Sequence, residues 1–103
     1  FTLTDDAELL AIARTSGKVR WLKQLMRYEN EKKKSDPVFW VGPVLAGNRL
    51  WIANSRGELA WADPASGEVT PFAELGAPVS LAPVVAGQTL YVLDDSGRIT
   101  AYR

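Results

Sequence analysis

Carboxylates are the side chains of this sequence best suited to acid–base or metal chemistry, because its 103 residues contain neither His nor Cys. The missing imidazole removes the most common general base and metal ligand. The missing thiol removes disulfides, thiolate nucleophiles and thiolate metal sites. No Ser-His-Asp or Cys-His arrangement and no Gly-rich phosphate loop occurs. Catalysis would therefore depend on carboxylates, Lys or Tyr.

Two pairs of adjacent acids stand in turn-like segments, Asp5-Asp6 and Asp94-Asp95. Such pairs could bind calcium or act as an acid/base pair, but adjacent carboxylates tend to diverge, and neither pair has the further oxygen ligands of a calcium loop nearby. Asp63, before "PASG", could also be a metal ligand, although an acid there more often accepts backbone N–H groups of its own turn. We therefore predict no catalytic residue, no metal site and no bound cofactor.

A basic segment between residues 18 and 34 is the third candidate site, with seven Lys or Arg residues against two Glu. The sequence "SDPVFW" follows it directly. One interpretation is a solvated loop. The other is a protein-interaction surface, since aromatic and Arg side chains are enriched at interfaces. In the second interpretation the surface consists of Arg27, Lys32, Lys33, Lys34, Phe39 and Trp40.

The overall charge gives no support to a nucleic-acid partner. Twelve basic and twelve acidic residues cancel, so no net field attracts nucleic acid or an anionic membrane. No apolar run approaches the roughly 20 residues that a membrane-spanning helix needs. With 47% hydrophobic and 23% charged residues, the composition is that of a globular domain. A partner would have to be recognised by a local surface.

The elements that position these candidates are three copies of one repeat. Residues 43–62 and 83–102 share 6 identities in 20 at a spacing of forty, and residues 8–19 and 58–69 share 5 in 12 at a spacing of fifty. The ten extra residues lie in the connection after the first copy. Each copy alternates short apolar runs with Gly-containing turns, which predicts antiparallel strands joined by hairpins.

A period of about forty residues with four short strands per unit is typical of a β-propeller blade. We predict an all-β chain that forms part of one propeller domain, with ten strands in about two and a half four-stranded antiparallel blades. The predicted blade segments are residues 1–25, 42–73 and 82–103, with an insertion at about 26–41. Alternation in "VRWLKQL" favours a strand there over a short helix at residues 22–26. We expect Arg103 to be a natural C-terminus and Phe1 a cut end.

The segments "ELAWADPASGEV" and "ELLAIARTSGKVRW" resemble the quinoprotein-type, or PQQ-like, propeller repeat. The matching positions are Gly57, Leu59, Asp63, Ser66 and Gly67 in one copy, and Leu9, Ala11, Ser16, Gly17 and Trp21 in another. In this repeat type the Trp packs between neighbouring blades, so the resemblance implies a structural blade-docking role for Trp21. The second copy has Pro71-Phe72 in its place, and Phe72 could fill the role of the ring. Ala13 and Arg103 replace the expected Asp, and Trp61 replaces a small residue.

The insertion and the C-terminal segment further resemble the propeller lipoproteins of the machinery that assembles β-barrels in the bacterial outer membrane. That likeness implies a non-enzymatic periplasmic scaffold, held at the outer membrane by a lipid anchor outside this chain. Its partners would be other subunits of the assembly complex and nascent outer-membrane proteins. The alternative is a PQQ-dependent quinoprotein dehydrogenase, whose quinone and calcium ligands match nothing in this chain. An isolated fragment of this kind should self-associate, because it exposes apolar blade faces and unpaired strand edges.

Overall fold

The computed structural model describes residues 1–30, 32 and 35–103, and it contains strands and turns without a helix in that part of the chain. The prediction of an all-β fold is confirmed. The strands are β1 (Thr2–Leu3), β2 (Glu8–Ile12), β3 (Val19–Gln24), β4 (Tyr28–Asn30), β5 (Ser35–Pro37), β6 (Trp40–Ala46), β7 (Arg49–Asn54), β8 (Glu58–Ala62), β9 (Val69–Glu74), β10 (Val84–Ala86), β11 (Thr89–Leu93) and β12 (Ile99–Tyr102). No helix in the described ranges is long and apolar enough to cross a membrane.

These strands form three antiparallel sheets and one separate hairpin, each following chain order. Sheet 1 contains β1, β2 and β3; sheet 2 contains β6, β7, β8 and β9; sheet 3 contains β10, β11 and β12. The hairpin pairs β4 with β5. At the repeat spacings, β7 corresponds to β11, and β9 corresponds to β3. The strand β8 corresponds to both β2 and β12. The three sheets therefore follow the sequence repeat.

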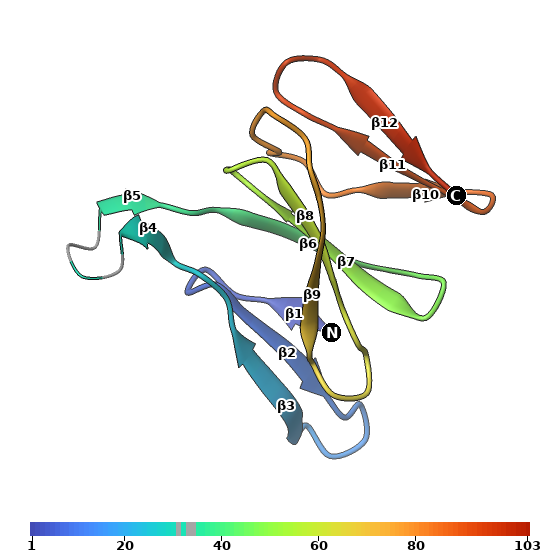
Figure 1. Ribbon diagram of the computed structural model, residues 1–103. Helices are drawn as coiled ribbons and strands as arrows, with labels where there is room; N and C mark the ends of the chain where they lie inside the picture. The colour runs from blue at the N-terminus through green and yellow to red at the C-terminus, as the bar shows by residue number, and fades with distance from the viewer. Residues whose placement is uncertain (31, 33–34) are drawn as a thin grey trace.

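The sheets lie one after another across a flat molecule of 42 × 42 × 18 Å (Figure 1). The blue sheet 1, the green sheet 2 and the orange to red sheet 3 follow in chain order, with sheet 2 between the other two (Figure 1). A partial propeller of PQQ-like repeats has this arrangement, because successive blades pack face to face around an axis.

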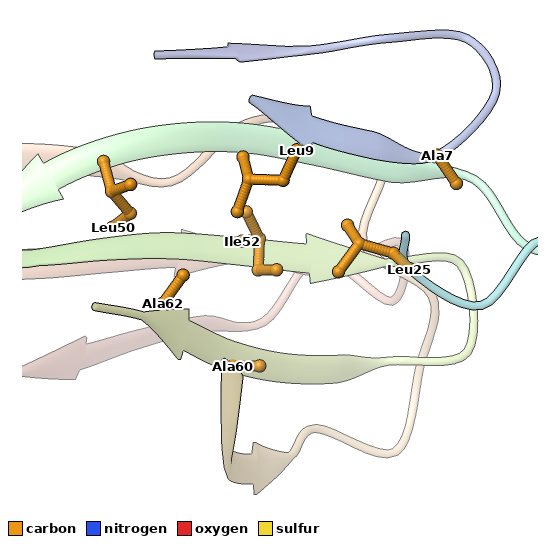
Figure 2. Close-up of a cluster of buried hydrophobic side chains, with 7 residues drawn as sticks. All are labelled: Ala7, Leu9, Leu25, Leu50, Ile52, Ala60 and Ala62. Carbon is orange, nitrogen blue, oxygen red and sulfur yellow. The ribbon is translucent and has the colours of Figure 1, made fainter. Parts of the chain in front are cut away.

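Sheet 2 is the centre of the core because both of its faces are covered. Alternate residues of a strand point to opposite faces, and in β7 Leu50 and Ile52 pack toward sheet 1 while Trp51 and Ala53 pack toward sheet 3. Leu50 and Ile52 belong to the first core cluster, in which they pack with Leu9 of β2 and Ala7 of the β1–β2 turn (Figure 2). This double burial explains why the run "LWIA" is apolar throughout.

The two end sheets keep one apolar face exposed. In sheet 1, Ile12 and Leu22 remain 43% and 51% exposed. In sheet 3, Val84 and Ile99 remain 61% and 66% exposed. Their partners on the neighbouring strand, Tyr91 and Leu93 respectively, are also partly exposed. Such faces are suited to packing against further blades or against another molecule.

The insertion differs from the prediction. The sequence predicted ten strands and read residues 26–41 as a connection, whereas the described residues form twelve strands, two of them in the β4–β5 hairpin. The strand at Val19–Gln24 was correctly preferred over a helix. The first strand of sheet 2 begins at Trp40, two residues earlier than the predicted blade segment.

Candidate interaction surface

Three equivalent turns build one end of the molecule, each beginning with a side chain that caps its own backbone. Asn54 and Asp94 are almost fully buried at positions forty residues apart. The Oδ1 atom of Asn54 accepts the N–H groups of residues 56 and 58, and that of Asp94 accepts those of residues 96 and 98. In sheet 1 the hydroxyl of Thr4 accepts the N–H of Glu8. Ala7 closes this turn at φ 59°, where the other two copies have Gly.

The paired acids belong to these turns, and the two members of the second pair have different partners. The hydroxyl of Ser96 donates to Asp94, and this bond is the main reason that the pKa of Asp94 lies below its usual value; backbone N–H groups and the charge of Arg98 also lower it, whereas burial opposes them. Asp95 instead accepts the hydroxyl of Ser80 at 2.9 Å. Asp6 pairs with Arg27, at 3.3 Å between Oδ1 and Nη2.

Asp63 likewise caps its own turn, accepting the N–H of Ala65 at 2.8 Å. No group of three acidic, His or Cys side chains that could hold a metal occurs in the part of the chain that the structure describes.

The two connections between sheets cross this end of the molecule in equivalent ways. The N–H of Leu25 donates to the carbonyl of Ala7, and fifty residues later the N–H of Leu75 donates to the carbonyl of Gly57, both at 2.8 Å. The second connection then passes directly to sheet 3. The first carries the extra residues, which extend as the β4–β5 hairpin beyond the sheets (Figure 1). The insertion therefore adds a projecting arm without altering how the blades are joined.

The base of the β4–β5 hairpin is fixed by buried groups. Val38 is only 6% exposed, and its N–H donates to the carbonyl of Arg27 at 2.8 Å. The indole N–H of Trp40 donates to the carbonyl of Met26 at 2.8 Å, while its ring packs against the first core cluster. Trp40 is thus a structural member of the base, whereas the sequence interpretation placed it on the contact surface.

Phe39 lies beside Trp40 and has the opposite environment. Its backbone is held from both sides by Ser55, whose N–H donates to the Phe39 carbonyl at 2.9 Å and whose hydroxyl accepts the Phe39 N–H at 3.0 Å. Its ring is nevertheless 68% exposed. Because this backbone is already fixed, a partner that covers the side chain does not also have to order the chain.

Basic side chains lie in the neighbouring segments: before the hairpin, in its turn, and in the β7–β8 turn that binds Phe39. The guanidinium of Arg27 lies over the ring of Tyr28 at 5.6 Å and contacts Asp6. Arg56, in the turn that holds Phe39, contacts the sulfur of Met26 at 3.6 Å and Glu58 at 3.9 Å. Lys32 is exposed in the turn of the hairpin. Lys33 and Lys34, which the sequence also assigned to this surface, lie outside the described residues.

The remaining site residues lie between sheets. The indole N–H of Trp21 donates to the carbonyl of Pro64 at 2.8 Å, so β3 of sheet 1 contacts the β8–β9 turn of sheet 2. Phe72 forms edge-to-face contacts with Trp51 in its own sheet and with Tyr102 in sheet 3, at ring distances of 4.9 and 5.3 Å. Both positions therefore contact a neighbouring blade, by different geometry.

Sequence reasoning did not identify the hairpin or the residues that fix its base. Ser55 looked like an ordinary turn residue, and Val38 like part of a polar insertion. The forty-residue spacing did contain a signal for Ser55, which corresponds to Asp95. The N–H of Asp95 donates to the carbonyl of Pro78 in the second connection, as the N–H of Ser55 donates to the carbonyl of Phe39 after the hairpin.

Comparison with known proteins finds one family model and one curated relative that the chain resembles. The sequence model of the family described as "Outer membrane protein assembly factor BamB" matches residues 5–103. A curated protein with that same description from Alkalilimnicola ehrlichii is 27% identical over 104 aligned residues. The alignment covers 100% of this chain and 25% of that relative, so the chain spans about a quarter of the relative's length.

Proposed function

Because this chain belongs to the family of the outer membrane protein assembly factor BamB, we propose that it forms blades of a non-enzymatic scaffold in the β-barrel assembly machinery of the outer membrane. The scaffold works in the periplasm and is attached to the outer membrane by a lipid anchor outside residues 1–103. Its partners are other subunits of the assembly complex, and nascent outer-membrane proteins are a second class of partner.

The observation that best supports this proposal is the exposed side chain of Phe39, whose backbone is fixed by Ser55. Interfaces depend on a few aromatic and Arg anchors, and an anchor whose backbone is already fixed in the free protein binds at a smaller entropic cost. Arg27 comes directly before β4, and Lys32 lies in the turn of the β4–β5 hairpin. We propose that Phe39 is the apolar anchor and that the basic side chains orient an acidic partner surface around it.

A non-catalytic role suits the acids of this chain. Asp6 and Asp95 are engaged by Arg27 and Ser80, and Asp63 and Asp94 cap their own turns. These contacts hold the turns in shape, which is the structural use of Asp in a turn.

Site-specific photo-crosslinking in the bacterium that carries this protein tests the proposal. With a photoreactive phenylalanine analogue at position 39 of the full-length protein, we expect a crosslink to a subunit of the β-barrel assembly machinery, identified by mass spectrometry. The matched control is position 45, since Leu45 is 57% exposed but lies near the end of β6 opposite Trp40 and the hairpin. Crosslinks of equal yield from both positions, or none from position 39, would contradict the proposed surface.

A titration separates the scaffold from the dehydrogenase alternative. The full-length protein, mixed with pyrroloquinoline quinone and calcium in a calorimeter, should release no heat of binding. Micromolar affinity for either would favour the dehydrogenase.

A further inference from the structure

A groove between sheets 2 and 3 lies at the opposite end of the strands from the β4–β5 hairpin. Its volume is about 560 Å³, within the range of peptide and small-ligand sites. The β6–β7 and β10–β11 turns form its rim, and side chains from β7, β9 and β12 form its wall. We propose that this groove binds an acidic peptide segment that carries aromatic side chains.

The two gaps between sheets are filled differently. Between sheets 1 and 2 the indole of Trp21 packs so closely on the β8–β9 turn that a Cβ added at Gly67 would lie 2.5 Å from the ring. Sheet 2 has Pro71-Phe72 in place of this Trp, and Phe72 is the residue of the two that lines the groove. The neighbouring Phe72 contacts Tyr102 at the edge of the groove and remains 44% exposed.

The wall of the groove favours an aromatic or aliphatic side chain. Trp51, Phe72 and Tyr102 form a chain of edge-to-face contacts along it, and Val85 and Leu90 of sheet 3 also line it. A ring that enters the groove beside the exposed edge of Phe72 can continue the edge-to-face pattern, which aromatic pairs prefer.

The charge of the groove favours an acidic ligand. Arg49 and Arg103 line it, and no Asp or Glu is among its lining residues. The guanidinium of Arg49 lies 4.3 Å from the centre of the Trp61 ring, which holds its position through a cation–π contact. A guanidinium that uses its flat face in this way keeps its in-plane N–H groups for a carboxylate. The side chain is therefore ordered in the free protein and suited to bidentate binding.

Fluorescence polarisation with the full-length protein tests this inference. The probe is a labelled, end-blocked peptide in which two Phe alternate with two Glu. Three companion peptides replace Glu by Gln, Glu by Lys, or Phe by Ala. We expect the first peptide to bind best and its affinity to fall with added salt. Equal binding of the Glu and Gln peptides, or no binding by the full-length protein, would overturn the proposal.

Two substitutions locate the site. Gln88→Glu changes an exposed rim residue to a carboxylate of the same shape and should weaken binding of the Glu peptide about fivefold while improving that of the Lys peptide. Arg49→Gln should weaken the Glu peptide by a similar factor, as expected for an exposed ion pair. Thr15→Glu adds the same charge in an exposed turn of sheet 1 and should change nothing. If all three variants bind alike, the peptide binds elsewhere and the assignment of the groove is wrong.

Discussion

The contact between Trp21 and the β8–β9 turn can be tested with a pair of matched Gly→Ala substitutions. Gly17 and Gly67 occupy equivalent turns of two repeats, and both have positive φ, +69° and +79°. A Cβ at Gly17 would meet no atom within 4 Å, whereas at Gly67 it would lie 2.5 Å from Cε3 of Trp21 and 2.8 Å from Cδ2. Both substitutions therefore introduce a similar backbone strain, but only the one at Gly67 brings the new Cβ against the indole.

The expected free energies follow from this difference. Ala in a left-handed conformation should lower the free energy of unfolding by about 1 kcal/mol at either position. At Gly67 the indole must also move, which removes its bond to Pro64 and part of its packing; the two losses together add about 2 kcal/mol. We expect Gly17→Ala to cost about 1 kcal/mol and Gly67→Ala about 3 kcal/mol.

Urea unfolding of the protein that carries this chain, followed by circular dichroism, measures these values. The same pair of substitutions is then made together with Trp21→Ala. Without the ring, Gly67→Ala should cost no more than Gly17→Ala, giving a coupling of about 2 kcal/mol between residues 21 and 67. Equal costs at the two glycines in the presence of Trp21 would show that the indole does not dock on this turn.

Two further outcomes are expected. The isolated 103-residue chain should self-associate, because covering about 500 Å² of apolar surface contributes roughly 12 kcal/mol against association costs of several kcal/mol. Light scattering at tens of micromolar should show oligomers, and Ile99→Glu should weaken them. A well-folded monomer would contradict this prediction. Asp94, whose pKa is lowered mainly by the Ser96 hydroxyl, stabilises the fold when ionised, so its contribution should be lost as the pH falls below about 4. Asp94→Asn should show a flatter loss of stability between about pH 4 and pH 2, and unchanged curves would refute the role of this charge.

The sheets were predictable because the same order of apolar runs and turns occurs in each copy of the repeat. Turn residues at matching positions, such as Gly57 and Gly97, divide the apolar runs into strands of the right length. Burial on both faces also agrees with the sequence of β7, in which the four residues from Leu50 to Ala53 are all apolar and all buried. Local pattern and tertiary packing agree in these segments.

The β4–β5 hairpin was not predictable from its own residues. "YEN" and "SDP" are short, polar and without alternation, and Asp36 adopts φ 56°, which few residues other than Gly favour. What holds the hairpin is supplied from elsewhere: its base is buried at Val38, and its exit is bound to Ser55 in sheet 2. Propensity cannot report contacts between residues so far apart.

Trp40 shows the same limit for side chains. Its type and its basic neighbours suggested an exposed anchor, but exposure depends on the register of β6, in which Trp40 lies opposite Asn54 and turns its ring toward the core. The adjacent Phe39 points outward instead. A shift of one residue in a strand exchanges the buried and exposed faces, so composition alone could not say which of the two rings is exposed.

The two proposed surfaces are placed so that they need not compete. The strand β7 runs from Arg49, in the groove, to Asn54, in the turn beside the hairpin. Five residues of extended chain separate the two ends by roughly 17 Å. A peptide in the groove and a subunit on Phe39 would therefore contact opposite ends of the same buried strand. Because β7 is the most completely buried strand described, its rigidity should keep both surfaces in place while leaving Arg49→Gln without effect on crosslinking from position 39.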